Sequence, residues 1–424
     1  MKDYKQRIVD SLLDRRLQGK GAILIEGPKW CGKTTTAKQF AKSLLDLGQP
    51  DVLRNAIETY QVVPGALLRG DVPRLLDEWQ SLPQLWDMVR SEVDSRGEVG
   101  QFILTGSSVP AQQEEIRHSG TGRIGRLRMR TMSLWESGES TGTVRVQDLF
   151  DGKTIEPQPN LLDLEQVAYI LCRGGWPHTT FLKGEVALDQ ACDYYDTIYR
   201  VDILRVDNTR RSSERTRLLM RSYARNLASA VSFSKMAEDI KANDNASVTY
   251  ETISDYVDAL KKLFVLEDAP AWNPNLRSKH AIQSTDTRYF IDPSIAAAAL
   301  GVGPKDLTND LHTFGLMFEN MAMRDLRIYA DALDGSMYHY RDSSGLECDA
   351  VMHRRNGTYG LIEIKLGGID NIEKAATTLT NLTNKIDTSR MPAPSFMMVL
   401  TAVGQYAYRR PDGIYVIPIG CLRP

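Results

Sequence analysis

Gly27-Pro28-Lys29-Trp30-Cys31-Gly32-Lys33-Thr34 lies near the start of a chain of 424 residues and fits the pattern G-x-x-x-x-G-K-[ST]. In this pattern a turn of backbone N–H groups surrounds phosphate groups at the start of a helix. The apolar run Ala22-Ile23-Leu24-Ile25 precedes the turn, and a stretch of helical character, predicted to extend to Leu45, follows it. This order predicts the beginning of an α/β sheet with a phosphate-binding loop. The alternative is a chance glycine turn before a helix.

The residue types in this loop predict binding of ATP with Mg²⁺. Lys33 would place its ammonium group between the β- and γ-phosphates, and the Thr34 hydroxyl would ligate the metal ion. Backbone N–H groups of the loop and of the first helical turn would complete the site. The predicted ATP-binding residues are Gly27, Pro28, Lys29, Trp30, Cys31, Gly32, Lys33, Thr34 and Thr35.

Two carboxylates follow the next predicted strand, at residues 72–76. Asp77 would hold Mg²⁺ through water, and Glu78 would act as the general base that polarises the attacking water. Asp77 lies 44 residues beyond Lys33, a spacing that suits the next parallel strand. The alternative is an ordinary strand that runs into a solvated turn.

A third polar group ends the apolar stretch Phe102-Ile103-Leu104-Thr105-Gly106-Ser107-Ser108. In P-loop ATPases with an additional strand, that strand lies between the first two, and a polar residue at its tip contacts the γ-phosphate or the water. Thr105 or Ser107 would serve here. The alternative is a plain N-cap before the next helix.

An arginine-rich stretch follows, and one of its guanidinium groups could accelerate hydrolysis about a thousandfold or more by reaching the γ-phosphate. The preferred candidate is Arg123, in Gly-Thr-Gly-Arg; the others are Arg117, Arg126, Arg128 and Arg130. The last three are spaced two apart, as expected for one solvated face of a strand. Whether an arginine acts on its own nucleotide or on a neighbour's stays open.

A second group of charged residues lies near the C-terminus, on two predicted strands at residues 347–352 and 360–365. Glu363 and Lys365 are two apart and share a face, with Asp349 on the preceding strand. Metal-dependent nucleases use such a layout, in which carboxylates hold Mg²⁺ and a lysine orients water or stabilises phosphate charge. The alternative is an amphipathic hairpin with a solvated polar face. Glu319, on a predicted helix, could add a further carboxylate or be a surface charge.

The hairpin register decides between these interpretations. A two-residue turn at Asn356-Gly357 would place Asp349 opposite Ile364, whereas a three-residue connection would place Asp349 opposite Glu363. A joint site therefore requires a connection of odd length or a bulge.

The middle of the chain has a pattern of helix, turn, helix and strand over residues 234–266, with a second strand predicted at residues 288–291. This order indicates a winged helix-turn-helix or a small helical packing module that does not touch DNA. The arginine-dense stretch at residues 200–225 could follow a phosphate backbone or form salt bridges with its neighbours.

The composition of the chain limits the partners and the cellular compartment that can be expected. The formal net charge is −2, which does not favour a nucleic-acid partner, although a local basic face remains compatible with it. The five cysteines are scattered without a metal-ligand spacing, as expected for a reducing cytoplasm. The charged N-terminus does not resemble a signal peptide, and no apolar run approaches about 18 residues, so no membrane association is predicted.

Taken together, these motifs make nearly the whole chain similar to bacterial and archaeal AAA-fold ATPases that carry a C-terminal domain of unknown function. The resemblance implies an α/β fold with an AAA-type P-loop NTPase core at residues 1–137. A linker and helical segment at 138–231, a winged-helix-like domain at 232–304 and a restriction-endonuclease-like domain of the PD-(D/E)xK kind at 305–424 would follow. Asp349, Glu363 and Lys365 match the catalytic positions of that pattern, and Glu319 matches its helix acid. Asp349 follows Glu347-Cys348, where the motif's name has a proline.

Two functions are compatible with this resemblance. One is an ATP-hydrolysing enzyme that couples its nucleotide state to metal-dependent cleavage of DNA or another nucleic acid. The other is an ATP-driven switch that binds DNA or protein and has a non-catalytic C-terminal domain. Homo-oligomeric rings and regulated monomers both use this core, so the sequence leaves the oligomeric state open.

Overall fold

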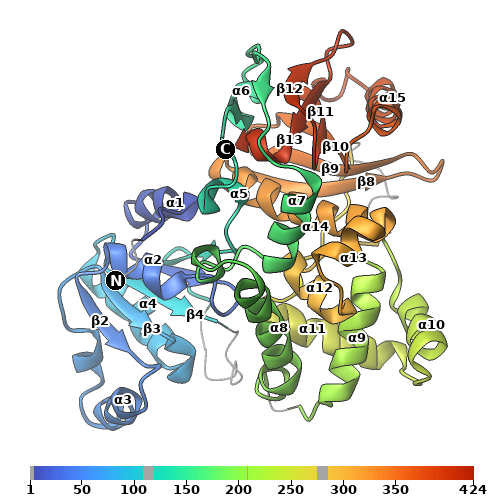
Figure 1. Cartoon of the computed structure of the whole chain (residues 1–424). Helices are drawn as coiled ribbons and strands as arrows, with labels where there is room; N and C mark the ends of the chain where they lie inside the picture. The colour runs from blue at the N-terminus through green and yellow to red at the C-terminus, as the bar shows by residue number, and fades with distance from the viewer. Residues whose placement is uncertain (1–3, 108–118, 208, 275–284) are drawn as a thin grey trace. The chain divides into compact units, whose positions relative to one another are not determined.

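The computed structural model describes residues 4–107, 119–207, 209–274 and 285–424 (Figure 1). The chain forms two compact units, and each unit is made of three segments. The first unit consists of Met1–Thr131, Ile198–Ser213 and Val257–Val265, and the second of Met132–Thr197, Glu214–Tyr256 and Leu266–Pro424. The helices α8 (Glu185–Arg200), α9 (Ser213–Arg225) and α11 (Tyr250–Lys262) each have residues in both units.

The first unit is built on a five-stranded parallel sheet with the order β2-β3-β4-β1-β5. Its strands are β1 (Ala22–Glu26), β2 (Ser43–Asp46), β3 (Arg74–Asp77), β4 (Phe102–Gly106) and β5 (Ile124–Arg128). The predicted mixed α/β fold with a parallel sheet is therefore confirmed. The prediction that the third strand inserts between the first two is also confirmed, because β4 lies between β1 and β3.

Alternating side chains along these strands form a hydrophobic core on each face of the sheet. Leu24, Leu76 and Leu104 belong to one core, with residues of α3 (Pro50–Val62) and α4 (Leu85–Arg96). Ile25 and Ile103 belong to the other, with residues of α1 (Ile8–Leu17) and α2 (Lys33–Phe40). The result is a sheet with helices on both faces, the usual arrangement for parallel strands.

The second helix is shorter than predicted. It ends at Phe40, whereas the sequence pattern suggested that it continues to Leu45. Residues 43–46 instead form the edge strand β2, whose register with β3 pairs Leu45 with Leu76. Backbone bonds at both ends extend this pairing, from Lys42 N–H to Pro73 and from Leu47 N–H to Asp77. Tertiary pairing thus overrides a local helical pattern, which is common for short segments.

The second unit contains a mixed seven-stranded sheet with the order β7-β12-β13-β11-β10-β9-β8. Its strands are β7 (Gln158–Pro159), β8 (Gly335–Arg341), β9 (Glu347–Arg354), β10 (Tyr359–Lys365), β11 (Phe396–Thr401), β12 (Tyr406–Arg409) and β13 (Tyr415–Pro418). The first three C-terminal strands, β8 to β10, form an antiparallel meander, and β11 returns parallel to β10 after α15 (Ile369–Lys385). The long helix α14 (Leu311–Ala332) packs against β8 to β10 (Figure 1).

Residues 137–160, predicted as a linker or an irregular excursion, belong to this second unit. The strand β6 (Val144–Arg145) pairs with β14 (Leu422–Arg423), and β7 pairs with β12. The Gly-, Ser- and Pro-rich composition of the segment reflects its many turns around the helices α5 (Leu134–Ser137) and α6 (Val146–Phe150).

Four further α-helices of the described residues lie between β7 and β8 in the sequence. They are α7 (Leu164–Arg173), α10 (Phe233–Asp244), α12 (Pro293–Leu300) and α13 (Pro304–Asn309). After α11, two isolated antiparallel bridges join Leu266 with Phe290 and Ala269 with Thr287.

Candidate functional site

The parallel sheet of the first unit brings three predicted motifs to one edge. Strands β1, β3 and β4 are neighbours in register, with Glu26 beside Gly106 and Asp77 beside Thr105. The carboxyl ends of parallel strands meet at the same edge of a sheet, and that is where α/β proteins bind ligands. The glycine loop after β1 therefore lies next to the carboxylates after β3 and the hydroxyl groups after β4.

The loop geometry depends on its two glycines. A Cβ atom on Gly27 would lie 2.0 Å from the carbonyl oxygen of Met129, so only glycine fits there. Gly32 has a φ of 101° and caps the N-terminus of α2, whose first residue is Lys33. The Lys33 ammonium donates to the carbonyl oxygens of Gly27 at 2.9 Å and Pro28 at 2.7 Å. The lysine is thus held over the loop at the start of a helix, as predicted for a phosphate ligand.

The predicted Mg²⁺ ligands lie side by side. The Thr34 hydroxyl donates to Asp77 Oδ1 at 2.8 Å, and the Thr105 hydroxyl donates to the same oxygen. A hydroxyl and a carboxylate are hard oxygen donors, which Mg²⁺ prefers. The residues present therefore fit this ion, and Thr105 orients Asp77.

The proposed general base, Glu78, lies at the same edge. It has a φ of 55°, an uncommon conformation for a residue other than glycine. Its Oε2 accepts hydrogen bonds from the Ser107 hydroxyl, at 3.2 Å, and from the Gln80 amide. The sequence pattern singled out Ser107 but missed Gln80, although its position two residues after Glu78 could have suggested the contact.

Other loop residues have different surroundings. Cys31 is buried, whereas Trp30 and Thr35 are exposed. The buried Arg7 guanidinium donates to the carbonyl oxygens of Cys31 at 2.9 Å and Arg130 at 3.0 Å, and this support for the loop was not foreseen. Arg117, one of the alternative arginines, lies outside the described residues.

Arg123 does not lie at the edge that carries the loop. It immediately precedes β5, whose register pairs Ile124 with Ala22, at the amino end of β1. Its guanidinium forms an ion pair with Asp94 at 2.7 Å. A role for Arg123 on its own nucleotide therefore finds no support, because the loop follows the opposite end of β1. A role on a neighbouring copy stays a prediction.

In the second unit, the β9–β10 hairpin adopts the register that a joint site requires. Arg354 N–H donates to the Thr358 carbonyl at 2.8 Å, so the connection has three residues. Ala350 pairs with Ile362, which places Asp349 opposite Glu363. On its other side β9 has an irregularity, because Tyr338 pairs with Val351 but Tyr340 pairs with Cys348. The extra residue lies at Asp349-Ala350, and such bulges redirect side chains.

Lys365 joins the two carboxylates of this hairpin. Its ammonium lies 2.7 Å from Asp349 Oδ2 and 2.8 Å from Glu363 Oε2. Asp349 Oδ2 also accepts the Ile364 N–H at 2.7 Å. On α14, Glu319 accepts a hydrogen bond of 2.5 Å from the hydroxyl of Tyr289, a residue that the sequence did not indicate.

Burial and like charge shift the ionisation of this cluster. Burial and the neighbouring Asp349 raise the pKa of Glu363 to about 8, against the opposing effect of Lys365. Burial and Asp349 also raise the pKa of Glu319 well above its ordinary range. For Lys365, burial lowers the pKa, but the attraction of both carboxylates prevails and raises it.

The cluster does not have the arrangement of a metal site. Among the described residues, no group of three or more His, Cys, Asp or Glu side chains is placed to hold a metal ion. Lys365 engages both of the predicted ligands, Asp349 and Glu363. Metal binding at these carboxylates stays a prediction.

Family models match three stretches of the chain. Residues 19–137 match the family model described as "AAA domain". The first part of the chain is an AAA-type P-loop ATPase domain. Residues 164–306 and 314–422 match two further models, each described as a domain of unknown function. No curated protein matches the chain significantly.

Among solved structures, the chain is similar to a Walker-type ATPase of Pyrococcus abyssi. The two sequences are 14% identical, and the superposition has a TM-score of 0.44. It covers 70% of this chain and 96% of the other.

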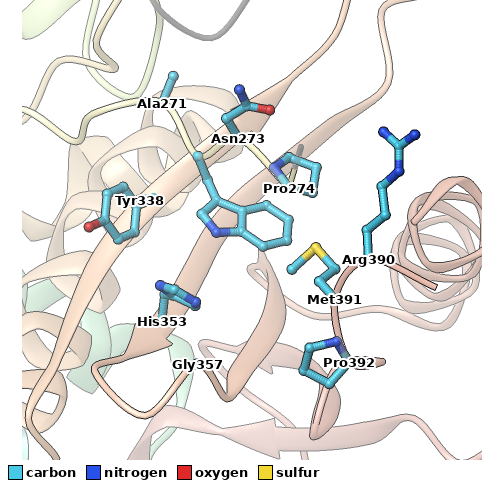
Figure 2. A pocket seen from close by; sticks show the side chains of 10 residues that line it. Ala271, Asn273, Pro274, Tyr338, His353, Gly357, Arg390, Met391 and Pro392 are labelled. Atoms are coloured by element: carbon cyan, nitrogen blue, oxygen red, sulfur yellow. The ribbon is translucent and has the colours of Figure 1, made fainter. Parts of the chain in front are cut away.

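The cavities of the second unit include two that lie beyond the AAA domain. One, of about 510 Å³, is lined by Glu319 and Lys365 together with His312 and Asn371. The other, of about 890 Å³, is lined by none of the predicted site residues. Figure 2 shows Tyr338 and His353 on one side of this second cavity and Met391 and Pro392 on the other.

Several arginines of the stretch at residues 200–225 form ion pairs. Arg225 bridges Asp239 and Asp244, at 2.7 and 2.8 Å. Arg211 pairs with Asp207 at 2.6 Å. These contacts support the salt-bridge interpretation of the segment at residues 200–225.

None of the described helices is both long and apolar enough to span a membrane.

Proposed function

We propose that this protein hydrolyses ATP and that its nucleotide state controls the rest of the chain. The observation that carries the proposal is the meeting of Thr34, Asp77 and Thr105 at the edge of the parallel sheet, with Glu78 beside them. Lys33, held over the loop at the start of α2, binds the phosphates.

The residues at the carboxyl ends of β1, β3 and β4 have different roles in this proposal. Thr34 and Asp77 would hold Mg²⁺, which when bound neutralises charge on the phosphates. Glu78 accepts a proton from the attacking water, and Ser107 and Gln80 orient its carboxylate through hydrogen bonds to Oε2. Thr105 fixes the orientation of Asp77.

The test of this proposal is direct. Purified full-length protein should bind ATP saturably in the presence of Mg²⁺ by isothermal titration calorimetry, and it should release phosphate. Lys33→Ala should abolish the binding, because it removes the ammonium group that is held over the loop at the start of α2. If the unaltered protein shows no saturable affinity for ATP with Mg²⁺, the proposal fails.

For the second unit, we infer a binding platform whose contacts change with the nucleotide state. The two matched domains at residues 164–306 and 314–422 are large enough to bind a macromolecule, DNA or protein, and the Lys365 ammonium already contacts both Asp349 and Glu363. The helices α10 and α11 with the bridges at Leu266 and Ala269 support a winged-helix-like arrangement within residues 232–304.

A second candidate is nucleic-acid cleavage by a restriction-endonuclease-like domain at residues 305–424. It is favoured by the hairpin register that sets Asp349 opposite Glu363 and by the cavity that Glu319 and Lys365 line. Single- and double-stranded DNA and RNA should be incubated with Mg²⁺ or Mn²⁺, with and without ATP, using Lys365→Ala as the control. Cleavage that disappears in the variant would establish nuclease activity. If no substrate is cleaved, the second unit is instead a binding platform.

A further inference from the structure

The glycine loop carries a second lysine with an unusual partner. The Lys29 ammonium lies 2.5 Å from Asp202 Oδ1, although the two residues are 173 positions apart in the sequence. Asp202 begins a single 3₁₀ turn, Asp202–Leu204, that follows α8. Both residues belong to the same compact unit, so this contact is part of the AAA-containing core.

The two partners differ sharply in exposure. The Lys29 side chain is 43% exposed, whereas the Asp202 side chain is only 5% exposed. A lysine ammonium is a compact charge with three donors on a flexible stem, so it can turn toward a new anion. A buried carboxylate cannot turn to water without movement of its backbone, and losing its counter-ion leaves it strongly destabilised.

Lys29 is placed where such an exchange can occur. It follows Pro28, whose carbonyl oxygen contacts Lys33, the predicted phosphate ligand. ATP carries several negative charges, so its phosphates attract an ammonium group that lies close to them. Asp202 and the phosphates therefore compete for one ammonium group.

We propose that Asp202 is the counter-ion that Lys29 exchanges for the phosphates of ATP, so that nucleotide binding loosens the turn at Asp202. Asp202 is thus a positioning residue that acts through Lys29. This inference rests on the proposed function, because it requires ATP at the loop. It adds a second phosphate-binding lysine and the means by which the nucleotide state reaches a segment far along the chain.

The turn at Asp202 lies in a segment that follows α8, a helix with residues in both units. Residues 198–213 belong to the first unit, and most of α8, which ends two residues before Asp202, belongs to the second. Asp207 anchors the same segment separately, through Arg211 at 2.6 Å and Lys262 at 3.3 Å. Loss of the Lys29 contact would therefore free the turn at residues 202–204 while the remainder of the segment stays attached.

The first test measures the affinity for ATP with Mg²⁺ by calorimetry. Asp202→Asn keeps the size of the side chain and removes its charge, so ATP should bind about fivefold to tenfold more tightly, a typical size for coupled sites. Lys29→Met should weaken binding, and adding Asp202→Asn to Lys29→Met should change nothing further. Asp207→Asn is the matched control, because it loosens the same segment without touching Lys29 and should leave the affinity unaltered.

The second test needs no variant. In the unaltered protein, ATP should accelerate backbone hydrogen exchange at residues 203–205, whose amides include the Arg205 N–H bonded to the Asp202 carbonyl. Asp202→Asn should show the faster exchange already without ATP. Unchanged or weaker ATP binding by Asp202→Asn, or slower exchange with ATP, overturns this inference while ATP binding by the unaltered protein still stands. Absence of that binding would overturn both this inference and the proposed function.

Discussion

Thr34 Oγ1 and Asp77 Oδ1 lie 2.8 Å apart, although the two residues are 43 positions apart in the sequence. The first belongs to the start of α2 and the second to the end of β3. Their hydrogen bond connects the phosphate-binding loop with the carboxylate that is predicted to hold Mg²⁺. The Thr105 hydroxyl donates to the same Asp77 oxygen. The relation makes the Mg²⁺ dependence of ATP binding testable at a single hydroxyl group.

Thr34→Ala removes this hydroxyl without changing the backbone of the loop. The affinity for ATP measured with Mg²⁺ should fall about tenfold to a hundredfold, the usual cost of disturbing a metal site. The affinity measured in EDTA should change little. Thr34→Ser, which retains the hydroxyl, is the control and should behave like the unaltered protein. An equal loss with and without Mg²⁺ would show that Thr34 has no metal role.

Glu78→Gln removes the carboxylate that is predicted to accept a proton from water. ATP binding should persist, and the rate of phosphate release should fall about a hundredfold or more, because general bases contribute that much. Gln80→Ala removes only a hydrogen bond to Glu78 and should have a smaller effect on the same rate. Normal turnover by Glu78→Gln would rule out Glu78 as the base.

Arg324 should be the most important single ion-pairing residue for the stability of the second unit. Its buried guanidinium contacts Asp292 at 3.1 Å and Asp325 at 2.8 Å, and both carboxylates are buried as well. Those carboxylates also accept the Gly175 and Leu134 N–H groups, at 2.9 Å each. Arg324→Leu removes the guanidinium group that pairs with both buried carboxylates and should cost about 3–5 kcal/mol.

Hydrogen exchange of the α14 amides across a urea series measures this cost. Arg217→Leu is the comparison, because Arg217 and its partner Glu214 are far more exposed, with side-chain exposures of 35% and 63%. Its loss should cost no more than about 1 kcal/mol. Equal losses of unfolding free energy in the two variants would show that the buried ion pairs stabilise the unit no more than an exposed ion pair does.

Glu363 should make the second unit less stable as the pH rises. Burial, followed by the nearby Asp349, raises its pKa from 4.5 to about 8, so the folded protein holds a proton that the unfolded chain has released. Between these two values the free energy of unfolding should therefore decrease with pH, by up to about 1.4 kcal/mol per pH unit. Below the unfolded pKa the contribution is fully present.

Glu363→Gln should remove this dependence, and urea unfolding followed by α14 hydrogen exchange at pH 6 and pH 8.5 would measure it. Glu251→Gln, at an exposed helical position, should leave the slope as it is in the unaltered protein. A pH slope that persists in Glu363→Gln would assign it to another group.

Local patterns predicted several parts of the site correctly because those parts depend on neighbours in the sequence. The glycine loop needs two glycines at fixed spacing, and Gly27 and Gly32 satisfy requirements of close packing and positive φ. The insertion of β4 between β1 and β3 was expected from the likeness to P-loop ATPases with an additional strand. By contrast, the end of α2 at Phe40 depends on pairing between β2 and β3, which no local pattern encodes.

Residue types and their spacing were enough to predict the phosphate-binding loop, the two strands that carry Asp77 and Thr105, and the residues available to a C-terminal hairpin. These features follow from residue type and spacing, because backbone conformation over a few residues is a local property. The contacts Lys29–Asp202 and Tyr289–Glu319 could be known only from the folded chain. The same holds for the position of Arg123 at the amino end of β1, away from the glycine loop, and for the contacts of Lys365 with two carboxylates. Such contacts join residues far apart in the chain, and they form only when burial of the separate cores brings the elements together.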